Sequence, residues 1–472
     1  MRLNNFSDFR KNLKDKKVFI WGLGLNRGGL EAVKFFCRHK SIVTVVDLKS
    51  KEELKETIDQ LKRFKVNYLL GDHDEKTFVG ADLIIKNPAI SWEAALAKKL
   101  LKKYQIETDV TLFFKFFKGP IVGITGSKGK TTTTTLISES LKKTGHRILL
   151  GGNLRVSLFS FIKEEYLKDK KIIAVLELSS FQLEDLDGIK KSPNLAVVTN
   201  ILRDHLNRYG NYANYIAAKQ NICRFQNKRD ALILNNQDKK SHYFDQVSKA
   251  KKIYFSGKKI ISFDGYFSDK EGNIFLSKRG VTKKLFTIRN PILRTEVNLK
   301  NTCATMAVLG GYFRIGDEKI LAALEKFKGV PYRMEIVRKL KSVTFINDTT
   351  ATIPDASMMA IKNFKKNLIL IAGGADKDLK FDKWAEEVSS RVKFVVLFEG
   401  SALSKIKTSL RKQKIKVNSD EVSNMDKAVK LAYKKAVKGD VILLSPGCAS
   451  FGVFKNEFDR GDQFNEAVKR LR

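Results

Sequence analysis

Short apolar runs alternate with amphipathic stretches along most of the chain. Each apolar run has the length of a buried strand, and the stretch after it repeats its apolar residues at helical spacing. This alternation is typical of parallel sheets whose successive strands are joined by helices. The predicted strands are 17–21, 42–46, 121–125, 172–178, 195–200, 231–235, 343–346, 368–372, 394–398 and 441–444. The pattern therefore predicts an α/β protein.

The predicted elements fall into three segments, and a chain of 472 residues exceeds what one hydrophobic core usually holds. We expect a Rossmann-like N-terminal domain, a central P-loop ATPase-like parallel sheet and a Rossmann-like C-terminal domain. Their expected limits are 1–112, 113–329 and 330–472. Within the central segment, residues 251–287 have a β-rich, irregular pattern, and helices are expected at 300–311 and 317–328.

The composition is that of a globular protein, with 43% hydrophobic and 30% charged residues. No apolar run reaches the length of about 18 residues that a membrane span needs, so we expect no membrane association. The first residues contain no apolar signal region. The cysteines (Cys37, Cys223, Cys303 and Cys448) are too far apart for a metal-ligand or disulfide pattern. A cytoplasmic location is therefore expected.

The net charge is +38, because 89 Lys and Arg face 51 Asp and Glu. Such an excess attracts polyanions, so a non-catalytic basic protein that binds nucleotide or nucleic acid is one alternative. However, lysine pairs such as 16–17, 102–103 and 251–252 recur along the whole chain, which is typical of solvated faces. The sequence has no basic arm, zinc-finger spacing or RNP-type motif. We therefore expect no dedicated nucleic-acid partner.

The first segment has a glycine-rich turn after its first strand. Gly22 and Gly24 follow the strand, a Gly28-Gly29 pair leads the next helix, and Asp47 ends the second strand. This order is typical of dinucleotide folds, in which glycines let the backbone approach a phosphate. The spacing differs from G-x-G-x-x-G because Arg27 occupies the third glycine position. A tight turn without a ligand is the alternative.

The second segment carries the strongest local motif, G-I-T-G-S-K-G-K-T-T at 123–132. A strand precedes it and a helix follows, which is the context that a phosphate-binding loop requires. Lys130 can reach the β- and γ-phosphates, and the Thr131 hydroxyl can bind Mg²⁺. The standard loop has glycine at 124, where this chain has Ile124. The sequence predicts ATP as the ligand.

The spacing G-x-x-G-x-x-G-K-T resembles the ATP loop of Mur ligases and folylpolyglutamate synthetases. Further motifs resemble the D-glutamate-adding members of the Mur ligase family, and they run in family order from about residue 17 to 461. They are L-E-L-S-S-F-Q-L-E at 176–184, D-H at 204–205, Y-I-A-A-K at 215–219, P-Y-R-M-E at 331–335, N-D-T-T-A-T at 347–352 and S-P-G-C-A-S-F at 445–451. The chain departs from the family pattern at Lys128, Arg155, Asn207, Val297, Tyr332 and Thr350.

The resemblance implies ATP-dependent ligation of D-glutamate to UDP-N-acetylmuramoyl-L-alanine in peptidoglycan precursor synthesis. It implies an acyl-phosphate intermediate, two Mg²⁺ ions, a CO₂-derived carbamate on one lysine, and a monomer. Another amide ligase of the Mur or folylpolyglutamate type is the nearer alternative. The folylpolyglutamate enzymes lack the first domain, and the motifs at 176–184 and 445–451 argue against other Mur enzymes.

The resemblance also assigns roles to individual residues. Catalytic roles are expected for Lys130, His205, Lys219 and Asp348. ATP is expected at Gly126, Ser127, Lys128, Gly129, Lys130, Thr131, Thr132, Asn298, Asn301, Arg333 and Asp348. The uridine-nucleotide substrate is expected at Gly24, Leu25, Asp47, Leu48, Asn87, Asn153, Ser179 and Gln182. D-glutamate is expected at Thr352, Lys377, Ser450, Phe451 and Phe458, and the metal at Thr131, Glu177, His205 and carbamylated Lys219.

Overall fold

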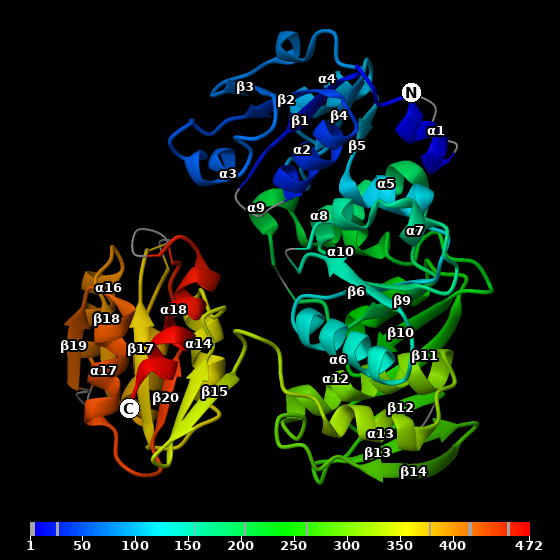
Figure 1. Cartoon of the computed structure of the whole chain (residues 1–472). Coiled ribbons are helices and arrows are strands. Elements are labelled where there is room, and N and C mark those ends of the chain that lie inside the picture. The colour runs from blue at the N-terminus through cyan, green and yellow to red at the C-terminus, as the bar shows by residue number, and fades with distance from the viewer. Residues whose placement is uncertain are drawn as a thin grey trace. The chain divides into compact units, whose positions relative to one another are not determined.

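The structure is a computed structural model that describes residues 5–24, 28–154, 156–202, 204–260, 263–376, 379–413, 418–450 and 454–472. The chain forms two compact units, Met1–Phe327 and Lys328–Arg472. The first unit contains two sheets and the second contains one, all built mainly from parallel strands (Figure 1). The predicted α/β class is confirmed. The predicted domain limits, including the division at 112/113 inside the first unit, stay predictions.

The first sheet is fully parallel, with strand order β3-β2-β1-β4-β5. Its strands are β1 (Lys17–Trp21), β2 (Ile42–Asp47), β3 (Val66–Leu70), β4 (Leu83–Lys86) and β5 (Ile106–Glu107). The helices around it are α1 (Phe6–Lys11), α2 (Gly28–Arg38), α3 (Lys55–Asp59), η1 (Glu75–Phe78) and α4 (Ala95–Leu101). The order reverses at β1, so ligand-binding loops are expected at the carboxyl ends of β1 and β4.

An aromatic core joins the first sheet to the second. Phe9 of α1 lies 5.2 Å from Phe116 of α5 (Asp109–Phe116), and Phe36 of α2 lies 5.7 Å from Phe159, measured between ring centroids. Phe159 belongs to η2 (Leu158–Phe161), which follows a strand of the second sheet. One cluster of buried apolar residues extends from β1 to β10. This shared core explains why residues of both sheets form a single compact unit.

The second sheet has nine strands in the order β14-β13-β12-β11-β10-β9-β6-β8-β7. They are β6 (Ile121–Thr125), β7 (Ile148–Gly152), β8 (Ile173–Glu177), β9 (Leu195–Val198), β10 (Ala231–Asn235), β11 (Lys251–Ser256), β12 (Gly265–Ser268), β13 (Asn273–Lys278) and β14 (Val281–Thr287). Among the described pairs of this sheet, β12–β13 and β13–β14 are antiparallel and the others are parallel. The irregular segment 251–287 thus forms β11 to β14, which extend the sheet to one edge.

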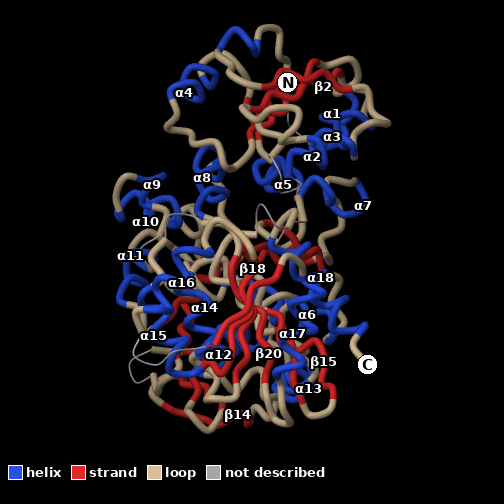
Figure 2. The backbone as a smooth tube through the Cα atoms, turned by 90° about the vertical axis from the view of Figure 1, so that its left-hand side faces the viewer, coloured by secondary structure: helices blue, strands red, loops and turns tan. Residues whose placement is uncertain are grey.

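The helices of the central part connect these strands. They are α6 (Lys130–Lys143), α7 (Glu164–Leu167), α8 (Ser180–Ile189), α9 (Leu206–Tyr209), α10 (Tyr212–Gln220), η3 (Lys239–Ser241), α11 (His242–Asp245), α12 (Glu296–Met306), η4 (Ala307–Tyr312) and α13 (Asp317–Glu325). Figure 2 shows these helices in blue and the strands in red. The helix expected at 300–311 starts earlier, at Glu296, and ends in the π-helical segment η4.

The second unit contains one sheet with strand order β15-β16-β20-β17-β18-β19. Its strands are β15 (Glu335–Leu340), β16 (Val343–Asn347), β17 (Leu368–Gly373), β18 (Val392–Phe398), β19 (Asn418–Val422) and β20 (Val441–Leu444). Its helices are α14 (Pro354–Ile361), α15 (Asp382–Arg391), α16 (Leu403–Arg411), α17 (Met425–Lys435) and α18 (Glu457–Arg470). Two separate apolar cores show that α17 and α18 cover one face of the sheet, and α14, α15 and α16 the other.

Among the described residues, no helix has both the length and the apolar character needed to cross a membrane.

Candidate active site

The phosphate loop lies between β6 and α6. Gly126 and Gly129 have φ angles of +150° and +81°, which L side chains rarely adopt. A Cβ on Gly126 would overlap Thr199 Oγ1, and a Cβ on Gly129 would lie 2.9 Å from Asn301 Oδ1. The N-cap of α6 has no side-chain hydrogen bond, so the first N–H groups of this helix are available to an anion. The predicted loop is therefore formed.

Asn200 holds the backbone of this loop from the neighbouring strand. Its side chain accepts a hydrogen bond from Lys128 N at 2.9 Å and donates one to Lys128 O at 2.9 Å. Thr199 Oγ1 donates to the same carbonyl at 2.6 Å. The Lys128 side chain is exposed. Lysine at this position therefore leaves the loop braced, because the bracing amide comes from residue 200.

Lys130 and Ser127 are both directed at the loop itself. Lys130 Nζ donates to Gly126 O at 2.9 Å and to Ser127 O at 3.2 Å. The Ser127 hydroxyl donates to Leu202 O at 3.2 Å, accepts from Leu202 N at 2.9 Å, and lies 3.0 Å from the Tyr215 hydroxyl. Ser127 thus ties the loop to the segment that carries His205. Thr132, also predicted for ATP, lies in the first turn of α6.

Glu177 is the last residue of β8 and is only 2% exposed. Thr131 Oγ1 donates to its Oε2 at 2.7 Å, and Asn153 Nδ2 donates to its Oε1 at 2.9 Å. The Asn153 backbone N–H also donates to Glu177 O at 2.8 Å. Asn153, predicted to contact the uridine-nucleotide substrate, therefore orients Glu177 in this structure.

Lys219 lies on α10 and is 2% exposed. Its Nζ donates to Thr125 Oγ1 and to Gly126 O, both at 3.2 Å. Burial, together with the positive charge of Lys130, lowers the pKa of Lys219 to about 7. A large fraction of this side chain is therefore a neutral amine near neutral pH, beside the phosphate loop.

His205 lies immediately before α9 and has a φ angle of +52°. Its ring centroid is 5.0 Å from that of Phe181 and 6.3 Å from that of Tyr215. Burial lowers its pKa; Asp204 raises it, whereas Lys219, Lys130 and Arg208 lower it further. A neutral imidazole is the form that can bind a metal.

The two asparagines of α12 lie against the loop from another direction. Asn301 Oδ1 accepts a hydrogen bond from Thr133 Oγ1 at 3.3 Å, and Asn301 Nδ2 donates to Asn298 Oδ1 at 3.1 Å. Val297, which replaces the family histidine, is 53% exposed. The structure thus brings Asn301 directly to the loop, and Asn298 through Asn301.

The side-chain oxygens of Thr131 and Glu177 fit an Mg²⁺ ion that is bound together with a phosphate. Among the described residues, no group of three or more His, Cys, Asp or Glu side chains is placed to hold a metal ion. Thr131 and Glu177 offer hard oxygen atoms 2.7 Å apart at the start of α6. Mg²⁺ commonly takes only one or two protein oxygens and completes its shell with phosphate oxygens and water.

The carboxyl edge of the first sheet holds the residues predicted for the uridine nucleotide. Asp47 Oδ2 accepts from Gly24 N at 3.1 Å, and Asn87 Nδ2 donates to Gly22 O at 3.2 Å. Leu48 is 68% exposed, and Leu25 lies outside the described residues. The glycine-rich turn is therefore held by the two polar residues that end β2 and follow β4.

Ser179 and Gln182 form a capping box at the start of α8. Ser179 Oγ accepts from Gln182 N at 3.2 Å, and Gln182 Oε1 accepts from Ser179 N at 3.2 Å. Their polar groups thus hold the helix start, which does not by itself require a ligand.

In the second unit, Asp348 follows β16 and is 8% exposed. It accepts from Met334 N at 3.2 Å and from Ser445 Oγ at 3.0 Å, and burial raises its pKa to about 7. The adjacent residue to Met334 is Arg333, which is exposed. A substantial fraction of Asp348 is therefore protonated near neutral pH.

Among the residues predicted for D-glutamate, Thr352 and Ser450 follow the carboxyl ends of β16 and β20, and Phe458 is the second residue of α18. Ala375 N donates to Ala449 O at 2.9 Å, which joins the loop after β17 to the loop after β20. Ser450 is 1% exposed, Thr352 is half-buried, and the Phe458 ring lies 5.3 Å from that of Tyr332. Lys377 and Phe451 lie outside the described residues.

The sequence patterns missed some residues that build this region. Asn200 had one signal, since it is a polar residue at the end of a strand next to the strand of the phosphate loop. Lys86, Asp185 and Arg208 form ion pairs beside the first sheet, and no local sequence pattern reveals these pairs because the partners are separated along the chain.

Three family models match the chain in order. They are the Mur ligase MurD-like N-terminal domain at residues 16–106, the Mur ligase middle domain at 124–309, and the Mur ligase glutamate ligase domain at 332–448. The UDP-N-acetylmuramoylalanine–D-glutamate ligase of Roseiflexus sp. (strain RS-1) is 36% identical over 97% of this chain and 99% of its own. The enzyme of the same name from Clostridium perfringens is 35% identical over 99% of each chain.

Solved structures share the fold at lower identity. The UDP-N-acetylmuramate–alanine ligase of Thermotoga maritima has a TM-score of 0.60 at 20% identity, over 96% of this chain and 99% of its own. The MurF ligase of Thermotoga maritima, solved in complex with ADP, has a TM-score of 0.56 at 20% identity, over 98% and 100%. These likenesses show the three-domain α/β fold.

Proposed function

Because the chain belongs to the Mur ligase family, we propose that it joins D-glutamate to UDP-N-acetylmuramoyl-L-alanine and converts ATP to ADP and phosphate. This reaction makes a peptidoglycan precursor. One observation carries the ligase chemistry: Lys130, Thr131, Glu177 and Lys219 meet at the carboxyl edge of the second sheet. The choice of D-glutamate rests on the relatives, which are named D-glutamate ligases and match this chain over nearly their full length.

The proposed reaction has two steps. The alanyl carboxylate attacks the γ-phosphorus of ATP, so that a P–O bond forms, ADP leaves and an acyl phosphate results. The amine of D-glutamate then attacks the acyl carbon, loses a proton, and phosphate leaves with the C–O bond electrons. Side chains need only position the reactants and offset negative charge. Lys130 and the first N–H groups of α6 are placed to do this at the phosphates.

Mur ligases use ATP and Mg²⁺, and Mg²⁺ supplies charge neutralisation at the phosphates when it is bound. Thr131 and Glu177 are the oxygens we assign to it, with His205 and carbamylated Lys219 at a second ion. For Lys219, the neutral amine adds to CO₂ and releases a proton, giving a carbamate anion. Its lowered pKa favours the neutral amine, and an uncarbamylated ammonium would repel Mg²⁺.

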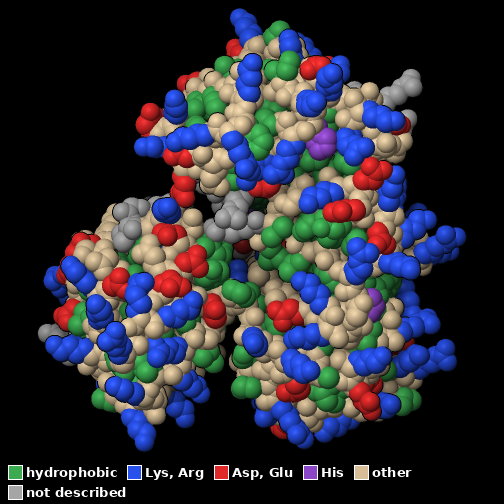
Figure 3. All heavy atoms as spheres, viewed as in Figure 1, with side chains coloured by type: hydrophobic (Ala, Val, Ile, Leu, Met, Phe, Trp, Pro, Cys, Tyr) green, Lys and Arg blue, Asp and Glu red, His purple; other side chains and the backbone are tan. Residues whose placement is uncertain are grey.

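Other residue roles in the proposal follow the family pattern. Asn298, Asn301, Arg333 and Asp348 serve ATP, and the turn near Gly24, with Asp47 and Asn87, serves the uridine nucleotide. D-glutamate is held by Thr352, Ser450 and Phe458, together with Lys377 and Phe451. We also propose that the enzyme acts as a monomer in the cytoplasm. Figure 3 shows Lys and Arg spread over the visible face of each part, interspersed with Asp and Glu.

The test is ADP release with ATP, UDP-N-acetylmuramoyl-L-alanine and a series of amino acids. D-glutamate should be preferred over D-alanine and L-lysine by about 10⁴-fold or more in kcat/KM, because a site built for two carboxylates leaves cations unpaired without them. Equal use of D-alanine or L-lysine would make another Mur-type ligase the better assignment.

The variant Lys130→Ala separates catalysis from mere nucleotide binding. It should lower kcat by about 10³-fold or more while the melting temperature stays unchanged, because Lys130 neutralises charge on the transferred phosphoryl group. Lys142→Ala, an exposed lysine near the end of the same helix, is the control and should be active. Normal ADP release from folded Lys130→Ala would mean that the loop does not carry the chemistry.

A further inference from the structure

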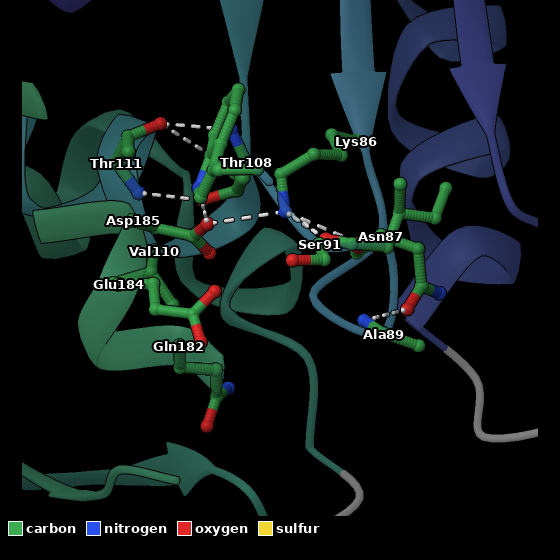
Figure 4. Close-up of polar contacts among 12 residues, drawn as sticks. Lys86, Asn87, Ala89, Ser91, Thr108, Val110, Thr111, Gln182, Glu184 and Asp185 are labelled. Carbon is green, nitrogen blue, oxygen red and sulfur yellow. Dashed lines mark hydrogen bonds and ion pairs between the residues drawn. The ribbon is translucent and has the colours of Figure 1, made fainter. Parts of the chain in front are cut away.

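A loop of the first sheet is held by two cations that no part of the proposed reaction uses. This loop, residues 87–92, follows β4 and carries Asn87. Lys86, the last residue of β4, has a fully buried side chain whose Nζ lies 3.2 Å from Asp185 Oδ1 on α8. The same Nζ donates to Asn87 O at 3.3 Å and to Ile90 O at 3.0 Å. Figure 4 shows Lys86 and Asp185 pointing toward each other from the two elements.

Trp92 closes the far end of the loop onto the same pair. Its Nε1 donates to Asp185 Oδ1 at 2.8 Å, and Lys86 Nζ lies 4.4 Å from its ring centroid. A lysine ammonium has three donors, and here they have three acceptors: one carboxylate oxygen and two loop carbonyls. A buried ion pair is weak evidence for stability by itself. The two further hydrogen bonds from Lys86 to carbonyls of the 87–92 loop indicate instead that this residue fixes the position of the loop.

Arg208 of α9 also binds the 87–92 loop. Its Nη2 and Nε bind the two oxygens of Glu184 at 2.9 and 3.3 Å, and the guanidinium carbon lies 3.9 Å from the Phe181 ring centroid. Nη1 donates to Ala89 O at 2.6 Å. The side chain is 10% exposed. Arg208 therefore links the loop to α8 at a residue adjacent to Asp185.

The elements joined in this way carry the candidate substrate residues. Asn87 of the loop binds the glycine-rich turn through Gly22 O. α8 begins with Ser179 and Gln182, and α9 begins directly after His205. Both cations thus connect the nucleotide edge of the first sheet to the catalytic edge of the second.

We propose that Lys86 and Arg208 are positioning residues for the uridine-nucleotide substrate. They bind the carbonyls of Asn87, Ala89 and Ile90 and hold the loop against Glu184 and Asp185. The loop therefore keeps a fixed position relative to the second sheet, and one substrate can contact both sheets. The assignment of the ligand rests on the proposed function. Neither residue is assigned contact with the reacting atoms.

The test uses full-length enzyme and two sets of variants. Arg208→Met removes the guanidinium, and Arg208→Lys keeps the charge but cannot bind Glu184 bidentately and a loop carbonyl together. The double variant Lys86→Met/Asp185→Asn leaves no unpaired buried charge and keeps an acceptor for Trp92, so the fold is preserved while the bonds to Asn87 O and Ile90 O are lost. Arg224→Met is the matched control. Arg224 pairs with Asp187, which lies on α8 with Glu184 and Asp185, and its hydrogen bonds go to Ala217 and Gln220 instead of the loop.

Arg208→Met and the double variant should raise the KM for UDP-N-acetylmuramoyl-L-alanine about tenfold while the KM for ATP stays within about twofold. Arg208→Lys should fall between Arg208→Met and the wild type. Arg224→Met should match the wild type in every KM. An unchanged nucleotide-substrate KM in both sets of variants, or an equal rise for all three substrates, would overturn the proposal.

Amide hydrogen exchange of residues 87–92 gives a second readout that does not depend on turnover. Exchange should be about tenfold faster in Arg208→Met and in the double variant, and unchanged in Arg224→Met. Unaltered exchange in both sets would also overturn the proposal. A wild-type enzyme without activity on this acceptor would refute the proposed function instead, and the exchange data would still decide whether the two cations fix the loop.

Discussion

At the scale of single residues, burial and charge divide the lysines of this strongly basic chain into two kinds. Most are exposed and solvated, whereas Lys86 and Lys219 are almost completely buried. Lys86 Nζ lies beside the Asp185 carboxyl group, whereas Lys219 Nζ hydrogen-bonds to a hydroxyl and a carbonyl and lies 5.0 Å from the Tyr215 ring centroid. Buried cations without a carboxylate partner have lowered pKa values. Lys219 is therefore the lysine of this site best suited to lose its proton.

Lys219→Ala tests the proposed carbamate. The variant should lose activity by about 10²-fold or more, and acetate should restore part of it by occupying the vacated oxygen position. The measurement is ADP release with increasing acetate, with potassium chloride at equal ionic strength as the comparison. Lys239→Ala, an exposed lysine of η3, should behave as the wild type. Wild-type activity in Lys219→Ala would remove this residue from the mechanism, and failed rescue would leave the carbamate unsupported.

Asp348 gives a prediction for pH. Burial raises its pKa from 3.8 to about 7, so the folded protein binds a proton that the unfolded chain releases. Its contribution to stability is complete at low pH and is lost as the pH rises through about 7. Asp348→Asn mimics the protonated form and should melt at a temperature close to the wild type near pH 4. Near pH 8 it should melt higher than the wild type.

Calorimetry of the ligand-free protein at several pH values measures this difference for the second unit. Asp355→Asn, at an exposed acid on α14, is the control and should show no such pH-dependent difference. A gap between Asp348→Asn and wild type that stays constant with pH would show that Asp348 is charged at neutral pH.

At the scale of elements, sequence patterns predicted the features whose residues are adjacent in the chain. The strands 17–21, 121–125 and 231–235 were predicted with the bounds that β1, β6 and β10 have, because buried parallel strands are continuous apolar runs. The edge strand β15 was missed because its residues are exposed or half-buried and show no apolar run. The phosphate loop was predicted because its glycines, lysine and threonine are adjacent in sequence. The contacts that hold the 87–92 loop were missed because residues such as Trp92 and Asp185 are 93 positions apart in the chain.

Asn200→Ala tests whether β9 braces the phosphate loop. It removes two hydrogen bonds to the backbone of residue 128, which should cost about 1–2 kcal/mol of stability and raise the KM for ATP several-fold. The KM for D-glutamate should stay unchanged. Asn236→Ala, at an exposed position after β10, is the control. A variant with wild-type ATP kinetics would show that the loop holds its shape without this side chain.

At the scale of the whole molecule, the family pattern assigns residues of both units to ATP. The phosphate loop, Asn298 and Asn301 belong to the first unit, whereas Arg333 and Asp348 belong to the second. Neither assignment could be reached from composition, since +38 charges spread over the whole chain do not single out one arginine. Only the motif order along the chain separated these residues from their many neighbours of the same type.

Arg333→Met tests the assignment of this arginine to the γ-phosphate. A guanidinium assigned to the γ-phosphate stabilises charge that develops during transfer, so its loss should lower kcat by about 10²-fold or more. ADP lacks that phosphate, and its dissociation constant should therefore stay within about twofold of the wild type. Arg333→Lys should recover only part of kcat, because an ammonium cannot make the bidentate contact. Lys339→Met, an exposed cation on β15, should leave both quantities unchanged. If ADP binding weakens as much as kcat falls, Arg333 acts on the nucleotide as a whole, and the γ-phosphate assignment is wrong.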